Sequence, residues 1–213
     1  MAEYSLMQKP TNVNAQTAAP DLVAMVASRI CHDLIGPIGA IVNGLELMDM
    51  AGGNSPGPER ELIADSADSA SARLRFFRIA FGAAGSQVIG RSDIETLLGQ
   101  IGRDSRMQVA WKPAGDQPRS AVKLAFLALL CCEAALPRGG QAHVIEADGA
   151  WTVVASGDKV SVDPALWGWL DGAGDAAALI PAKVQFALLP LAVDETGGQL
   201  RAERDATSLT LRF

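Results

Sequence analysis

The sequence lacks any cluster of lysine and arginine, and its 213 residues carry a formal net charge of −6. Proteins that bind nucleic acid gain most of their affinity from a basic patch, so this balance argues against DNA or RNA as a partner. Histidine is also scarce, since only His32 and His143 occur. A metal-dependent phosphohydrolase with a His-Asp dyad needs several His and Asp ligands, and the sequence therefore disfavours that class of enzyme.

Cysteine and long apolar runs are equally sparse. The three cysteines, Cys31, Cys131 and Cys132, form no CxxC pair, and two adjacent cysteines suit neither a structural disulfide nor a zinc site. Residues 1–20 show no basic start followed by an apolar run, and the apolar stretch 124–132 is far shorter than the roughly 20 residues of a membrane span. We expect a cytoplasmic protein with reduced thiols, no membrane association and a disordered tail over residues 1–20.

Two long amphipathic helices are predicted in the first part of the chain. They cover residues 21–50, with Asp21 as N-cap, and residues 59–81, and a Gly/Pro-rich turn at 51–58 joins them into a hairpin. The apolar stripe of the first helix has spacings of three and four residues and consists of Val23, Val26, Ile30, Leu34, Pro37, Ile41, Leu45 and Met48. Further apolar positions, which the packing of the two helices on each other does not account for, include Leu62, Phe76 and Ile79. Because two helices cannot bury so broad a surface alone, a homodimer with a four-helix bundle is expected.

The second part of the chain alternates between helical and extended patterns. Helices are predicted at residues 92–103, 120–136, 164–170 and 181–196, and strands at 108–112, 143–147, 151–155, 199–203 and 208–213. The small residues of 82–92 predict a flexible connection between a hairpin domain, residues 21–84, and a second domain, residues 92–213. The fold class is therefore α+β, a helical hairpin followed by a two-layer α/β sandwich.

The first helix places His32 on the side opposite its apolar stripe. At about 100° per residue, the residues Ser28, Gly36, Gly39 and Asn43 share that side with the imidazole. Each glycine costs on the order of 1 kcal/mol of helix propensity, and close approach of another backbone is a reason to accept that cost. Pro37 removes a helical hydrogen bond to residue 33 and bends the axis, and Asp33 is placed to select one imidazole tautomer. An ordinary surface histidine, with glycines that serve packing inside the hairpin, is the alternative interpretation.

The residues around His32 also resemble a known motif. The run His32-Asp33-Leu34-Ile35-Gly36-Pro37-Ile38 resembles the phosphoacceptor box of histidine kinases, in which His, an acidic residue and Leu precede a Pro five positions after the His. Residues 74–86, LRFFRIAFGAAGS, are similar more narrowly to the ChpT-type histidine phosphotransferases. Those are dimeric proteins with a kinase-like hairpin and a degenerate kinase-like ATPase domain. The resemblance covers nearly the whole chain after residue 20.

This resemblance implies a phosphorelay enzyme in which His32 carries the phosphoryl group and Asp33 holds the ring or takes its proton. Receiver domains of a hybrid sensor kinase and of response regulators are the implied partners, and Mg²⁺ is expected on the receiver rather than on this chain. The implied docking surface comprises Ser28, Ile35, Gly36, Gly39 and Asn43. If the hairpin turn centres near residue 54, Arg73, Arg75 and Arg78 lie near the level of His32, and one or more would neutralise phosphate, unless they are ordinary solvated charges.

The resemblance also implies that ATP is not bound and that no cofactor is held stably. Leu129 and Glu133 stand where the kinase helix would carry its paired asparagines, and residues 156–158 do not match the adenine-binding box. Residues 182–190, AKVQFALLP, contain no glycine, whereas a phosphate loop needs glycine-permitted backbone conformations. An active histidine kinase and a non-catalytic dimeric adaptor remain the alternatives.

Overall fold

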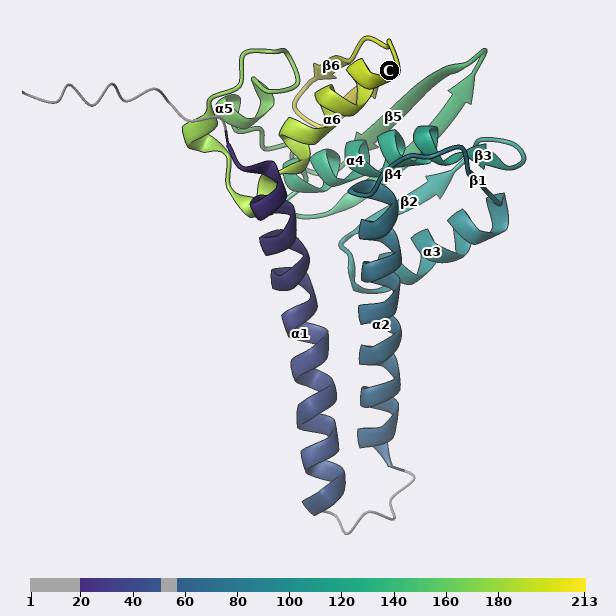
Figure 1. The fold of residues 1–213 in the computed structure, drawn as a ribbon, viewed down its shortest axis with the longest axis vertical. Coiled ribbons are helices and arrows are strands. Elements are labelled where there is room, and N and C mark those ends of the chain that lie inside the picture. The colour runs from purple at the N-terminus through teal and green to yellow at the C-terminus, as the bar shows by residue number, and fades with distance from the viewer. Residues whose placement is uncertain (1–19, 51–56) are drawn as a thin grey trace, which may run out of the picture.

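The computed structural model describes residues 20–50 and 57–213, so the predicted tail up to residue 19 and residues 51–56 of the predicted turn lie outside the described residues. Helices α1 (Leu22–Met50) and α2 (Pro58–Ala80) project side by side from a mixed α/β domain (Figure 1). Both predicted helices are thereby confirmed. The carboxylate of Asp21 accepts a hydrogen bond from the backbone N–H of Ala24 at 3.0 Å, which is the N-cap expected from the sequence.

The second part of the chain is built around a five-stranded sheet covered by helices (Figure 1). Its elements are β1 (Val88–Ile89), α3 (Arg91–Asp104), β2 (Met107–Trp111), β3 (Gln117–Pro118), α4 (Arg119–Ala135), β4 (Gly140–Ala147), β5 (Ala150–Ser156), α5 (Pro164–Trp167), the 3₁₀ turns η1 (Ala176–Ala178) and η2 (Pro181–Lys183), α6 (Gln185–Glu195), β6 (Arg201–Arg204) and β7 (Ser208–Arg212). The strand order is β2-β4-β5-β7-β6, with β2 parallel to β4 and the other pairs antiparallel. The predicted α+β class is confirmed.

Local turn chemistry explains where the sequence prediction holds and where it fails. Asp148 and Gly149 have φ values of 54° and 81°, so they form a tight hairpin turn between β4 and β5, whose segments were both predicted as strands. The predicted helix 164–170 is wrong in length, because the chain folds back after Trp167 and the N–H of Ala173 donates to the carbonyl of Gly168 at 2.7 Å. The predicted helix 181–196 is divided into η2 and α6, since its first residues make 3₁₀ hydrogen bonds.

Residues 82–92 do not form a loose connection between the two parts. Strand β1 lies within this segment and pairs with β3, and neither strand was predicted. The guanidinium of Arg119 donates to the backbone carbonyls of Arg78 and Ala83, and this anchors the segment to the first turn of α4. The hairpin therefore joins the α/β domain through fixed backbone contacts.

The C-terminal end of α2 is part of the main hydrophobic core. The ring of Phe76 stacks on Phe126 of α4 with centroids 4.4 Å apart and an interplanar angle of 5°, and Phe77 is buried beside it. The sequence predicts Phe76 and Ile79 in a dimer contact, and this prediction is wrong because α4 and its neighbours already bury both side chains. Leu62, the third residue of that set, remains exposed.

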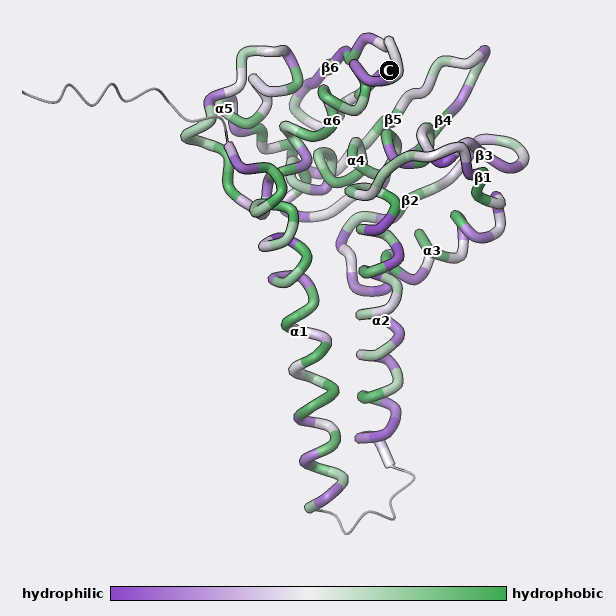
Figure 2. Tube along the Cα trace, in the orientation of Figure 1, coloured by the Kyte–Doolittle hydropathy of each residue, from purple (hydrophilic) through white to green (hydrophobic). Residues whose placement is uncertain are grey.

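Helix α1 is apolar over most of its length, whereas the first half of α2 is largely hydrophilic (Figure 2). By length and composition alone, α1 is the one described helix that could span a membrane, and here it packs along α2. The predicted stripe is wrong at two positions, since Val23 and Leu45 are 82% and 51% exposed. The two helices approach each other closely at Gly44, where an added Cβ would lie 2.6 Å from Cγ1 of Ile63. This glycine was not singled out from the sequence.

We expect Gly44→Ala to lower the free energy of unfolding by about 1–3 kcal/mol, because the added methyl group overpacks the contact with Ile63. Gly99→Ala in α3 is the matched control, since its Cβ would have no neighbour within 4 Å. The control should gain about 0.5–1 kcal/mol from helix propensity. Denaturant unfolding followed by circular dichroism measures both, and a stabilised Gly44→Ala protein would contradict the contact.

Candidate functional site

The imidazole of His32 stands out from the middle of α1, with its side chain 81% exposed. Its Nδ1 atom lies 3.0 Å from Oδ1 of Asp33, whose own side chain is only 11% exposed. The contact between neighbouring side chains expected from the sequence is therefore present. When Nδ1 carries the proton and donates a hydrogen bond to Asp33, Nε2 presents its lone pair to solvent.

The side of α1 around His32 is open. Ser28, Gly36 and Asn43 are exposed, and Ile35 is 69% exposed. A Cβ added to Gly36 or to Gly39 would meet no atom within 4 Å. Packing inside the hairpin, which was the alternative explanation for these glycines, is thus absent from the described chain. The helix also continues through Pro37, which leaves the carbonyl of Asp33 without its helical donor.

A second basic residue on α1, Arg29, was not identified from the sequence. Its guanidinium lies 2.9 Å from Oδ2 of Asp33 and also donates to the backbone carbonyl of Ala182 at 2.5 Å. Asp33 therefore has one oxygen on His32 and the other on Arg29. The spacing of four residues between Arg29 and Asp33 is the signal that could have revealed the pair, since such residues are neighbours on a helix.

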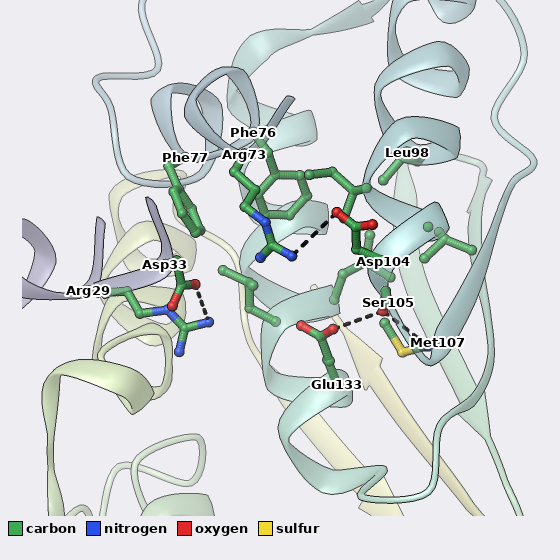
Figure 3. A pocket seen from close by; sticks show the side chains of 15 residues that line it. Arg29, Asp33, Arg73, Phe76, Phe77, Leu98, Asp104, Ser105, Met107 and Glu133 are labelled. Carbon is green, nitrogen blue, oxygen red and sulfur yellow. Dashed lines mark hydrogen bonds and ion pairs between the residues drawn. The ribbon is translucent and has the colours of Figure 1, made fainter. Parts of the chain in front are cut away.

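Arg29 and Asp33 line a cavity between the hairpin and the α/β domain (Figure 3). Arg73 and Phe77 contribute to it from α2, which agrees with the predicted level of His32 along the hairpin. Its remaining wall is made by Phe76, Leu98, Ile101, Gly102, Asp104, Ser105, Met107, Val109, Leu129, Leu130 and Glu133. Asp33 lines this cavity, whereas the exposed imidazole of His32 does not.

The three arginines predicted near His32 have different surroundings. Arg73 reaches the cavity and lies 3.8 Å from Asp104, so it is held on the inner side of Asp33 (Figure 3). Arg75 donates to Gln100 of α3 at 2.8 Å, and Arg78 lines a separate hollow with Arg75. Arg75 follows Arg73 by two residues and thus lies about 200° away around α2. The structure brings Arg73 alone of the three into the cavity that Asp33 lines.

The positions that correspond to the nucleotide-binding residues of a kinase have different side chains and a different secondary structure here. Leu129 is 3% exposed, and the carboxylate of Glu133 accepts a hydrogen bond from the hydroxyl of Ser105 at 2.9 Å. Residues 182–190 belong largely to η2 and α6, and Phe186 packs in the core. Across residues 20–50 and 57–213, no group of three or more His, Cys, Asp or Glu side chains is arranged to hold a metal ion.

Comparison with known proteins places this geometry in a family. The family model "Histidine phosphotransferase C-terminal domain" matches residues 91–208. The chain belongs to the histidine phosphotransferase family. It is 35% identical over 199 residues to "Protein phosphotransferase ChpT" of Brucella abortus (strain 2308), which covers 90% of this chain and 94% of that protein. The predicted membership of the ChpT-type family is confirmed, and the protein is a histidine phosphotransferase of a phosphorelay.

One solved structure agrees with this histidine phosphotransferase assignment. A bacterial phosphotransferase solved at 1.7 Å superposes with a TM-score of 0.73 at 34% identity, over 90% of this chain and 95% of that one. The histidine kinase AdeS of Acinetobacter baumannii aligns over 85% of this chain and 96% of that one, with a TM-score of 0.43 at 8% identity. The first of these supports the arrangement of hairpin and α/β domain described above.

We expect Gly36→Leu to keep the melting temperature of the protein while blocking transfer of a phosphoryl group to His32. The added side chain enters open space on the face of α1 that carries the imidazole of His32. Gly99→Leu, also at an unobstructed helix position, is the control and should transfer normally. Thermal unfolding and phosphotransfer are measured on the same preparations. Wild-type transfer by a stably folded Gly36→Leu protein would show that docking occurs elsewhere.

Proposed function

We propose that His32 accepts a phosphoryl group from the aspartate of one receiver domain and returns it to the aspartate of another. The observation that carries this proposal is an exposed imidazole whose Nδ1 contacts a carboxylate that is only 11% exposed, on an otherwise open helix face. Receiver domains of a hybrid sensor kinase and of response regulators are the partners. The exchange takes place in the cytoplasm, without nucleic acid and without a membrane.

The reaction needs little from this chain beyond a positioned nucleophile. Nε2 of His32 attacks the phosphorus of the receiver's aspartyl phosphate, and the bond from phosphorus to the carboxylate oxygen breaks with its electron pair on that oxygen. The proton on Nδ1 stays on the ring, so the positive charge that develops there faces the carboxylate of Asp33. The reverse sequence with a second receiver returns the phosphoryl group. Mg²⁺ held by the receiver would supply positive charge to the phosphoryl oxygens.

The docking surface in this proposal is the open face of α1 formed by Ser28, Ile35, Gly36, Gly39 and Asn43. Arg73 lines the same cavity as Asp33 and supports this docking surface from the interior side of α1. Arg75 and Arg78 face the α3 side of α2 and contribute to docking only if the receiver extends around the hairpin.

ATP has no part in the proposed cycle, and autokinase activity is not expected. Leu129 fills apolar space where a metal-binding asparagine would be needed, and Glu133 adds negative charge where a nucleotide would bring its phosphates. A helix in place of a glycine-rich loop at residues 182–190 offers no free cradle of backbone N–H groups. The phosphoryl group must then arrive from a partner.

The working molecule in this proposal is a homodimer with a four-helix bundle. An exposed apolar stripe of Ile38, Val42 and Leu45 runs along α1 on a different side from both α2 and His32, and Ile35 lies where this stripe meets the face around His32. Leu62 and Leu74 add exposed apolar area on α2. A second copy of the hairpin has the length and apolar periodicity to cover this stripe, since it carries the same residues.

The assignment of His32 is tested with a radiolabelled phospho-receiver domain. We expect label on the wild-type chain and on His143→Gln, and none on His32→Gln, because His143 lies on β4 of the α/β domain. The label should be labile in acid and stable in alkali, as an N–P bond requires. Label retained by His32→Gln would remove the basis of the proposed function.

The dimer is tested by sedimentation equilibrium at micromolar concentration. We expect twice the chain mass of 22.2 kDa. Replacing Ile38 and Leu45 by Glu should give monomers, because the exposed stripe would then carry charge into the bundle. Val88→Glu, at a similarly exposed apolar position on β1, is the control and should remain dimeric. A monomeric wild-type chain would contradict the bundle.

A further inference from the structure

We infer that Arg29 is a positioning residue for phosphotransfer, and that through it the C-terminal domain holds Asp33 in place against His32. This inference rests on the proposed role of His32 as phosphoacceptor. It assigns a task to a domain that carries none of the reacting atoms in that proposal.

The inference begins with a continuous chain of polar contacts. The backbone carbonyl of Ala182, in η2, accepts from Nη1 of Arg29, and Nη2 of Arg29 lies 2.9 Å from Oδ2 of Asp33. The other oxygen of Asp33 lies 3.0 Å from Nδ1 of His32. Ala182 and Arg29 are 153 residues apart in the sequence, so the contact chain links the two parts of the molecule.

Solvent exposure along this series of contacts distinguishes the reacting group from the supporting groups. The side chain of His32 is 81% exposed, whereas those of Asp33 and Arg29 are 11% and 17% exposed. A receiver docked on α1 therefore meets the imidazole directly. Arg29 lies on the cavity side, and it acts on the reaction only through Asp33 (Figure 3).

The chemistry of guanidinium suits this task. Its planar group presents donors in a fixed fork, so one donor can hold a carboxylate oxygen while another holds a carbonyl. With Oδ2 of Asp33 held in this way, Oδ1 remains directed at Nδ1 of His32. That geometry favours the tautomer with the proton on Nδ1 and leaves Nε2 as the nucleophile. If the carboxylate turned away, both tautomers would be populated and fewer encounters would find the reactive one.

Two other charged side chains that line the cavity have different partners. Arg73 of α2 pairs with Asp104, and Glu133 of α4 accepts from Ser105. Lys183 of η2 has its pKa lowered by burial and by the neighbouring charge of Arg29. Within the described residues, Arg29 is the basic side chain that forms an ion pair with Asp33, apart from His32 itself. No nearby cation stands in for it without rearrangement.

The experiment compares Arg29→Met and Arg29→Lys with wild type in the full chain. The matched control is Arg91→Met, which breaks an Arg–Glu95 pair of the same four-residue spacing on α3. Single-turnover transfer from a phosphorylated receiver domain is measured over a range of receiver concentrations. We expect Arg29→Met to lower the maximal rate by about tenfold or more while the half-saturating concentration stays within about twofold, because Arg29 does not face the receiver. Arg29→Lys should recover part of the rate, and Arg91→Met should match wild type.

A second readout separates positioning from general damage to the fold. The ¹⁵N chemical shifts of the imidazole of His32, recorded at alkaline pH where the ring is neutral, report its tautomer. We expect the Nδ1-protonated form in wild type and Arg91→Met, and a mixture in Arg29→Met. If Arg29→Met does not fold, Arg29→Lys decides the question by the same two readouts, and a reduced maximal rate with a mixed tautomer supports the inference.

Failure of the proposed function and failure of the positioning role of Arg29 would give different results. Label on His32→Gln would refute the proposed function itself. If His32 is the acceptor but the folded Arg29 variants keep both the wild-type maximal rate and the single tautomer, the positioning role of Arg29 is overturned while the proposed function stands.

Discussion

The stack of Phe76 on Phe126 is the contact on which the geometry of the site depends. It carries the end of α2 into the core of the α/β domain, so the hairpin is not an independent arm. Because α1 packs along α2, this contact also fixes the position along the hairpin axis at which Arg29 reaches η2 and Asp33 lines the cavity. The position of an exposed histidine on α1 is thus decided by aromatic packing on the neighbouring helix.

Helix α1 has three sides with different environments. One side packs on α2 and includes Gly44, which allows the two helices to approach. The side around His32 is kept open by Gly36 and Gly39, and the remaining side carries the exposed apolar stripe. Such a division explains why the helix is apolar over most of its length although little of it is buried within this chain (Figure 2). Each side is suited to a different contact.

The α/β domain supports the hairpin from a complete hydrophobic core. Leu129 and Phe186 are among its buried residues, and α6 covers most of residues 182–190. It contacts Arg29 of the hairpin through its backbone, at the carbonyl of Ala182. A carbonyl needs no particular side chain, so the residue types of this segment give no sign of the contact.

The sequence by itself determined the two long helices, the sheet-forming segments other than β1 and β3, and the open face around His32. These follow from periodicity and from the chemistry of glycine, proline and turn residues, which act over a few positions. The tertiary structure decided which partner each apolar face found, as with Phe76, which packs on α4 rather than in a bundle. It also decided the contact of Arg29 with Ala182 and the separate directions of Arg73 and Arg75. The physical reason is that a repeating pattern specifies that a face is buried or open, whereas its partner depends on packing between residues far apart in the chain.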